Sequence, residues 1–310
     1  MNNNSPYQFE RLSDDNIHHL CTLFSRVFKK NLFVADVLKK YNTRHLGVQY
    51  LGHMALMNGK PIAYGGFIPF RLGYQHQTEL GAQSVDSMAV NEAKGTGVFT
   101  HIYHLNEFLL KSSGIRFGYG FANQSSYPVF VNKFGWVSNR YMHSFVVPVK
   151  KALLNAGLKR VGGFDISKKF KEEFGHLVIN EPISQPFNDG QHGYTTYDKD
   201  YFRYKSDPMH YFIRVENAEV WIKLGNILSV GHFTLSSPDQ LPLIMDQLGR
   251  ICIKTGMTKI FFQFSENSMH ATALSKFYQP IIGTAICFKN FTGLIPQDKI
   301  LFSNADTDTF

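Results

Sequence analysis

The chain has 310 residues, of which 44% are hydrophobic, so it is long enough for one large domain or two and too apolar to be disordered throughout. Its formal net charge of +8 with 18% charged residues indicates a basic globular protein that favours anionic partners without choosing among them. Three scattered cysteines argue against a disulfide framework and favour a reducing, cytoplasmic compartment; neither a signal peptide nor a membrane span is expected.

The first ninety residues predict a strand, two helices and three further strands, from the spacing of their apolar residues. Ser13 is expected to cap the first helix, because two acidic residues follow it. Asn58-Gly59 predicts a tight hairpin turn. The expected elements are a strand over 7–12, helices over 13–28 and 34–41, and strands over 52–57, 61–74 and 78–90.

The next sixty residues alternate helix and strand. A helix is expected over 98–109, a strand over 116–121, a helix over 125–133 and a strand over 141–149. This order predicts an α/β fold of the α+β type, with a mixed, mostly antiparallel sheet flanked by helices. The predicted organisation is a first domain over 1–150, a linker over 151–208 and a second domain over 209–310.

The second domain echoes the first. Strands are expected over 211–222 and 227–235, followed by a helix that begins near Ser237. In each half a helix ends before a glycine, a strand follows, and an asparagine precedes the next helix. The echo predicts an internal duplication.

The segment between residues 84 and 102 carries the chemistry, because a strand runs into a Gly95-Thr96-Gly97 loop that opens a helix. Glycines let backbone N–H groups approach an anion, and the helix start and Lys94 add positive charge. The pattern predicts pyrophosphate binding. It is neither a Walker loop, since no Lys-Ser/Thr follows the glycines, nor a dinucleotide fingerprint, since Thr100 stands where the third glycine belongs.

The run from Ser87 to Trp136, SMAVNEAKGTGVFTHIYHLNEFLLKSSGIRFGYGFANQSSYPVFVNKFGW, resembles the GNAT superfamily of acyl-CoA N-acyltransferases. Segment 200–208 resembles tandem members from polysaccharide gene clusters. The resemblance implies an N-acetyltransferase with acetyl-CoA as co-substrate, no metal, and a small-molecule amine as acceptor, such as an amino sugar or a nucleotide-linked amino sugar. Glu92 departs from the family, which usually has Gln or Arg at the start of this loop.

The resemblance also implies a donor site made of the strand end, the loop and the helix start. The strand end would pair with the pantetheine amides like one more strand, and the loop would hold the pyrophosphate. One donor site is expected, in the first domain. The implied cofactor-binding residues are Met88, Ala89, Val90, Lys94, Gly95, Thr96, Gly97, Val98, Phe99 and Asn123.

Two catalytic candidates follow from the same resemblance. Asp86 aligns with an acidic position of the family, and its side chain is expected on the same face of the strand as those of Met88 and Val90. It is therefore the candidate base that takes a proton from the amine. Tyr127 is the candidate acid for the departing thiolate, because Val131 occupies the position where many members have a tyrosine.

Two other functions stay open. An aminoacyl-tRNA-dependent transferase of the tandem type is compatible with the charge of +8, although the intact glycine loop favours coenzyme A. A non-catalytic acyl-CoA-binding module would explain Glu92 and the absent tyrosine. Nucleic acid is not the expected partner, and a homodimer is left open. A metal at His101, His104 and Glu107 is not expected, because no further ligand is near in sequence.

Overall fold

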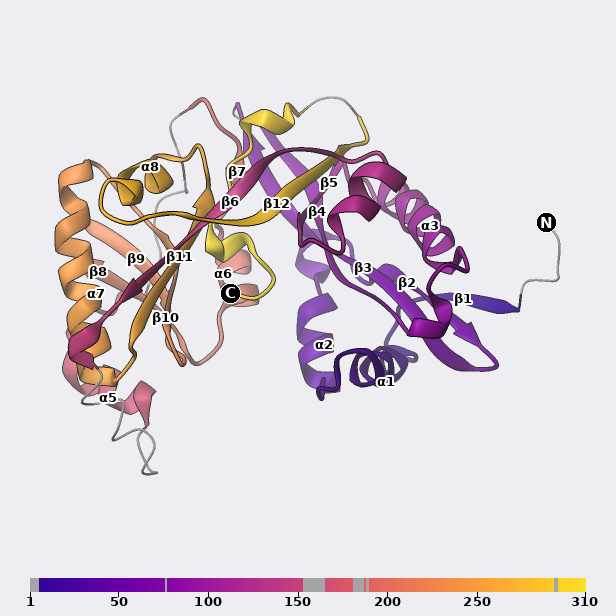
Figure 1. The fold of residues 1–310 in the computed structure, drawn as a ribbon, viewed down its shortest axis with the longest axis horizontal. Coiled ribbons are helices and arrows are strands. Elements are labelled where there is room, and N and C mark those ends of the chain that lie inside the picture. Colours follow the sequence, from indigo (N-terminus) through magenta and orange to yellow (C-terminus); the bar gives the residue numbers. More distant parts are fainter. Residues whose placement is uncertain (1–5, 76, 153–164, 181–186, 188–189, 293–294) are drawn as a thin grey trace. The chain divides into compact units, whose positions relative to one another are not determined.

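A computed structural model describes residues 6–75, 77–152, 165–180, 187, 190–292 and 295–310. The chain divides into two compact units (Figure 1). Unit 1 comprises Met1–Phe121, Phe130–Val137 and Cys287–Gln297. Unit 2 comprises Ala122–Val129, Ser138–Ile286 and Asp298–Phe310. No helix among the described residues is long and apolar enough to cross a bilayer.

Unit 1 contains an antiparallel set of strands that ends in a parallel pair. The strands follow the order β1-β2-β3-β4-β5, with the end of β12 beside β5. Pairing is antiparallel from β1 to β4, and β4 and β5 are parallel. The elements are β1 (Tyr7–Arg11), α1 (Ile17–Phe28), α2 (Val34–Tyr41), β2 (Leu51–Met57), β3 (Lys60–Tyr74), β4 (Gln77–Ala89), α3 (Val98–Ser112), β5 (Phe117–Ala122) and β12 (Ile281–Asn290).

Local chemistry explains where these elements begin and turn. Asn58 and Gly59 both have positive φ, 52° and 70°, which is the geometry of the predicted hairpin turn between β2 and β3. The predicted cap of α1 is wrong. The helix begins at Ile17, because the Asn16 side chain accepts a hydrogen bond from the Ser13 N–H at 2.9 Å and closes a turn before it.

Helices cover both faces of the unit 1 sheet, and two adjacent glycines in β3 mark the two faces. A Cβ placed on Gly65 would lie 3.3 Å from Ile102 on α3. A Cβ placed on Gly66 would lie 2.6 Å from the hydroxyl of Tyr41 at the end of α2. Since successive residues of a strand point to opposite faces, α3 and α2 pack on opposite sides of the sheet.

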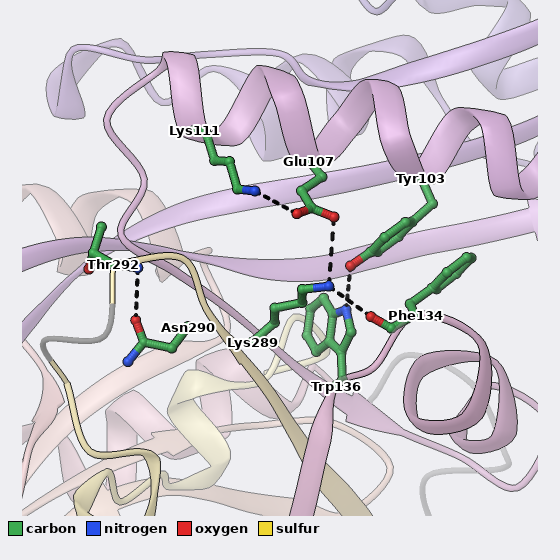
Figure 2. Close-up of polar contacts among 8 residues, drawn as sticks. All are labelled: Tyr103, Glu107, Lys111, Phe134, Trp136, Lys289, Asn290 and Thr292. Atoms are coloured by element: carbon green, nitrogen blue, oxygen red, sulfur yellow. Dashed lines mark hydrogen bonds and ion pairs between the residues drawn. The ribbon is translucent and has the colours of Figure 1, made fainter.

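The end of β12 is fixed inside unit 1 by Lys289 (Figure 2). Its Nζ donates to the carbonyl of Phe134 at 2.8 Å and forms an ion pair with Glu107 on α3 at 3.7 Å. The ammonium also lies 5.6 Å from the centroid of the Tyr103 ring. The Trp136 indole N–H donates to the Tyr103 hydroxyl at 2.9 Å. A strand that begins in unit 2 therefore ends as part of the packing of unit 1.

Unit 2 repeats the plan of unit 1. Its strands follow the order β6-β11-β10-β9-β8, with the first part of β12 beside β6. Strands β10 and β11 are parallel, and the other pairs among β6 and β8–β11 are antiparallel. The elements are β6 (Val137–Pro148), α5 (Ile166–Phe174), β7 (Tyr194–Thr195), α6 (Lys199–Lys205), β8 (His210–Val215), β9 (Ala218–Lys223), β10 (Leu228–Phe233), α7 (Leu241–Thr255), β11 (Lys259–Ser265) and α8 (Met269–Ser275).

The single strand predicted over 211–222 is wrong, because the chain turns back between β8 and β9. Glu216 has a φ of 52°, and a hairpin pairs Val215 with Ala218. The apolar pattern of the two strands is continuous, so nothing but the polar pair Glu216-Asn217 marks the turn. The same pairing scheme then emerges twice along the chain: β2-β3-β4-α3-β5 and β8-β9-β10-α7-β11. This agrees with the predicted duplication.

The strand that follows each repeat belongs to the other unit. β6 follows β5 in sequence but pairs with β11, and β12 follows β11 but ends beside β5. The compact units therefore differ from the predicted domains 1–150 and 209–310. The predicted linker also contains packed structure, because the Phe170 side chain of α5 is fully buried in the unit 2 core. Residues 153–164, 181–186 and 188–189 of that linker lie outside the described residues.

Two histidines buried in the core of unit 2 are expected to make the protein less stable at acid pH. Burial lowers the pKa of His270 to about 4 and takes that of His232 well below its ordinary value. Below pH 6.5 the unfolded chain binds protons that these folded side chains do not bind. We expect these two histidines to leave the free energy of unfolding unchanged above pH 6.5 and to lower it as the pH falls toward 4. Each histidine contributes a slope of about 1.4 kcal/mol per pH unit.

The measurement is a series of urea unfolding curves between pH 8 and pH 4. The His270→Phe variant keeps an aromatic ring stacked on Phe264, where the centroids lie 4.8 Å apart, and removes the titrating group. Its stability should fall less steeply with acid than that of the unmodified chain. Equal slopes in the two proteins would show that His270 does not carry the effect.

Candidate functional site

Strands β4 and β5 separate partway along their length. They are in register from Gly81 opposite Phe117 to Gln83 opposite Tyr119, and no further pairing between them follows although β4 runs on to Ala89. The second half of β4 therefore keeps its bonds to β3 and has an edge without a strand partner among the described residues of unit 1. Such an edge offers backbone donors and acceptors to an extended ligand.

A bulge in β4 decides which residues face this free edge. The register with β3 shifts between Val85 and Met88, so that two residues of β4 stand against one of β3. The N–H of Val90 donates to the carbonyl of Ile62 on β3 at 2.9 Å. Because successive residues of a strand direct their N–H groups to opposite sides, the N–H of Ala89 points away from β3, toward the free edge.

Asp86 lies in this bulge, where its φ of 51° is in the left-handed region that aspartate tolerates better than most residues. The sequence predicted the Asp86 side chain on the same face of the strand as Met88 and Val90. This prediction is wrong, because the bulge interrupts the alternation of side chains between Asp86 and Met88. The side chain of Asp86 is 15% exposed. The strained backbone thus holds a partly buried carboxylate beside the free edge.

Two residues of α2 hold the Asp86 carboxylate. Lys40 Nζ donates to Oδ1 at 2.9 Å, and the Tyr41 hydroxyl donates to Oδ2 at 2.7 Å. Burial first, and the charge of Asp86 second, raise the pKa of Tyr41 well above its ordinary value, so the hydroxyl stays protonated and can donate. Burial likewise raises the pKa of Tyr64, whose ring centroid lies 6.1 Å from that of Tyr41.

The loop after β4 exposes a set of backbone donors. A 3-10 turn over Asn91–Ala93 is followed by Gly95 and Gly97, with φ of 78° and 83°. The Thr96 side chain closes the loop by donating to the Ala93 carbonyl at 2.8 Å. Among the described residues, no acceptor meets the N–H groups of Gly95, Thr96, Gly97 and Phe99.

The space in front of this loop is open. A Cβ built on either loop glycine would meet no atom of the described residues within 4 Å. The glycines are therefore required by the positive φ angles and not by crowding. Four free N–H groups, the start of the 15-residue helix α3 and the exposed Lys94 make this loop a suitable anion cradle. The exposed Glu92 places one negative charge at its beginning.

The buried side-chain amide of Asn106 connects α3 with strands β2 and β3 next to the bulge. Asn106 of α3 is 2% exposed, and its Nδ2 donates to the carbonyl of Gly65, in the part of β3 that faces the bulge. Its Oδ1 lies 2.7 Å from Nδ1 of His53. Burial lowers the pKa of His53, so the ring is neutral at physiological pH and can donate from Nδ1.

Asn123 and Tyr127 belong to unit 2, whereas the loop and Asp86 belong to unit 1. The Asn123 Oδ1 accepts from the N–H groups of Ser125 and Ser126, both at 3.0 Å, so it closes a turn. The helix predicted over 125–133 is slightly shorter in the structure: it begins at Tyr127 after this turn and is π-helical over Val129–Lys133. Tyr127 and Asn123 line a pocket of about 470 Å³ together with Gln124, Tyr141 and Thr284.

Sequence reasoning missed Lys40, Tyr41 and Asn106. Lys40 and Tyr41 lie 46 and 45 residues before the carboxylate that they hold. Helical periodicity marks Tyr41 as a core position, and no local signal connects it with Asp86. Asn106 could have been singled out, because a polar residue among the apolar positions of an amphipathic helix requires a buried partner.

Two of the three residues considered for a metal, His101 and Glu107, have other contacts. His101 stacks on Phe9 with ring centroids 4.3 Å apart, and Glu107 pairs with Lys111 and Lys289. Within the described part of the chain, no group of three or more His, Cys, Asp or Glu side chains is arranged to hold a metal ion.

The fold was compared with known proteins. The chain matches no protein-family model and none of the curated proteins. It is similar to the solved structure of a GCN5-related N-acetyltransferase from Kribbella flavida, with a TM-score of 0.60 and 11% identity over 92% of this chain and 71% of that one. A GCN5-related N-acetyltransferase from Anabaena variabilis gives a TM-score of 0.57 and 11% identity over 92% and 72%. The likeness at these identities concerns the fold, and the resemblance of residues 87–136 pointed to the same one: the chain has the fold of the GCN5-related N-acetyltransferases.

Proposed function

We propose that the chain is an N-acyltransferase that takes an acetyl group from acetyl-CoA and transfers it to a small-molecule primary amine, with an amino sugar or a nucleotide-linked amino sugar as the acceptor class. The fold supports the acyltransferase class. The observation that carries the proposal is the free edge of β4 followed directly by a glycine loop with four N–H groups that have no partner among the described residues.

The chemistry of the donor fits these two features in their order along the chain. Coenzyme A joins a pantetheine arm, which has two amides, to a diphosphate. Ala89 supplies an N–H at the free edge for the arm, and the Gly95–Gly97 loop supplies amides for the diphosphate, with Lys94 as a full positive charge. A carboxylate repels the negative charge of a nearby diphosphate. Glu92 therefore weakens donor binding relative to Gln or Arg at the same position.

The residues of the chain have separate tasks in the transfer. Bound acyl-CoA supplies a thioester that a neutral amine can attack. Asp86 accepts the proton from the amine nitrogen on Oδ1 or Oδ2, and Lys40 and Tyr41 hold it in place. A backbone N–H at the free edge stabilises the negative charge that develops on the acyl oxygen. The roles of Tyr127 as the acid for the thiolate and of Asn123 as a cofactor-binding residue stay predictions from the sequence.

The test is incubation of the purified chain with isotopically labelled acetyl-CoA and a library of amino sugars and simple amines, followed by mass spectrometry. We expect labelled N-acetyl product from at least one amino sugar, and free thiol in equal amount. Binding of acetyl-CoA without transfer to any amine would contradict the proposal and favour a binding module. Absence of acetyl-CoA binding, with steeply salt-dependent binding of tRNA, would favour an aminoacyl-tRNA-dependent transferase.

A further inference from the structure

Unit 2 contains a counterpart of the separating strands of unit 1. Its parallel strands β10 and β11 are in register from Leu228 opposite Ile260 to Val230 opposite Phe262, and both continue beyond that point without further pairing to each other. Strand β10 also has a bulge here, because its register with β9 shifts between Val230 and His232. In both units the bulge follows the last parallel pair, so the two parallel strands of each repeat separate at the same point, and we call the space between them the cleft of that unit.

The cleft of unit 2 is filled by a segment of the same chain, Leu301–Phe310. The N–H of Ser265 at the end of β11 donates to the carbonyl of Phe302 at 2.9 Å, and the N–H of Phe302 donates to the Ser265 hydroxyl at 2.8 Å. Ser303 forms an antiparallel bridge with Phe264. On the other side, Asn304 Nδ2 donates to the carbonyl of Val230, the last paired residue of β10, at 3.1 Å. The segment therefore bonds to both separated strands.

Residues 301–307 and Phe310 of the segment are buried like core structure. Phe302 is completely buried, and Phe310 is 6% exposed with its ring against Gly231. A Cβ on Gly231 would lie 2.3 Å from that ring, so the glycine in the β10 bulge makes room for it. Asp306 is 1% exposed and closes the turn by accepting from the Ser303 N–H at 2.6 Å.

Three side chains around α6 anchor the segment from outside the cleft. The Tyr197 hydroxyl lies 2.8 Å from the Ser303 hydroxyl, and the Tyr201 hydroxyl donates to the carbonyl of Ala305 at 2.9 Å. Lys205 Nζ donates to the carbonyl of Thr307 at 2.5 Å. These bonds join α6 to a stretch that has no regular strand or helix of its own beyond one 3-10 turn.

We propose that Leu301–Phe310 is a built-in occupant of the second cleft, in the place that the acyl donor takes in the first, so that the chain binds one donor molecule, in unit 1. The inference rests on the proposed function for the position of the donor in unit 1. Asn304 bonds the β10 edge as a pantetheine amide would bond the β4 edge. The bonds that a ligand would need on β10 and β11 are made by the chain itself.

The first experiment measures donor stoichiometry on the whole chain by native mass spectrometry and by calorimetry with coenzyme A. We expect one molecule per chain, bound at least a hundredfold more weakly in the Gly97→Val variant. Two molecules per chain, or one whose affinity is unchanged in Gly97→Val, would overturn the inference. The absence of any binding to the unmodified chain would instead refute the proposed function.

The second experiment needs no donor and keeps the inference testable in that case. Hydrogen exchange of the unmodified chain should show slow exchange over residues 301–307, and the rate should not change at saturating coenzyme A. Asn304→Ala should speed exchange there about tenfold, the effect of losing one buried hydrogen bond. Asn290→Ala should not, although it removes two side-chain bonds in unit 1, from Asn290 Nδ2 to the Ile295 carbonyl and from the Thr292 N–H to Asn290 Oδ1. Fast exchange over 301–307 in the unmodified chain, or exchange that rises when coenzyme A binds, would overturn the inference.

Discussion

Replacing Gly97 by valine should reduce coenzyme A affinity at least a hundredfold while leaving the chain folded. The φ of Gly97 is 83°, and a β-branched residue adopts this region at a cost of about 1–2 kcal/mol or shifts the backbone out of it. Either response turns the N–H groups of the loop away from the diphosphate. Calorimetric titration of coenzyme A into the variant measures the loss.

Gly114 offers a matched control for this substitution. Its φ is 77°, and a Cβ there meets no described atom within 4 Å, as at Gly97, but it follows the end of α3 and not its beginning. Gly114→Val should lower the melting temperature by a similar amount and leave coenzyme A affinity unchanged. Equal losses of affinity in the two variants would mean that global destabilisation, and not the loop, explains the effect.

Replacing Asp86 by asparagine should lower the rate of acetyl transfer by a factor of about 10²–10⁴ without weakening donor binding. Asparagine keeps the size of the side chain and tolerates a positive φ, so the bulge is preserved. It accepts the hydrogen bond of Tyr41 through its amide oxygen, but it takes no proton from the amine. Steady-state kinetics with a saturating donor separate the fall in kcat from any change in KM.

The control for Asp86 is another ion-paired carboxylate on the same strand. Glu79 of β4 lies 3.4 Å from Arg116 and away from the bulge. Glu79→Gln should retain full activity. If Asp86→Asn also retained full activity, Asp86 would be a structural partner of Lys40 and Tyr41, and another base or a water chain would carry the proton.

The sequence was sufficient to locate most elements of the first 150 residues and the candidate loop, because both depend on local patterns. Helical apolar spacing placed α3, and the Gly95-Thr96-Gly97 pattern before it placed the loop, in which both glycines have positive φ. The Asn58-Gly59 hairpin followed from the same kind of local steric rule. At these positions the backbone conformation is decided by the residue itself.

Features that depend on distant contacts could not be predicted in this way. The bulge at Asp86 arises from the match of β4 to β3, and the residues that hold its carboxylate come from α2. The pairing of β6 with β11 likewise depends on which edge is available after the chain has folded. Apolar alternation alone marks a strand and does not name its neighbour.

The central claim, that the loop between Glu92 and Phe99 holds the diphosphate of the donor, is tested most directly by titrating coenzyme A into glycine-¹⁵N-labelled protein and following the amide resonances. We predict large, saturable shifts for Gly95 and Gly97, with Gly114 and Gly256 unmoved. Saturable shifts at other glycines, with Gly95 and Gly97 unchanged, would contradict it.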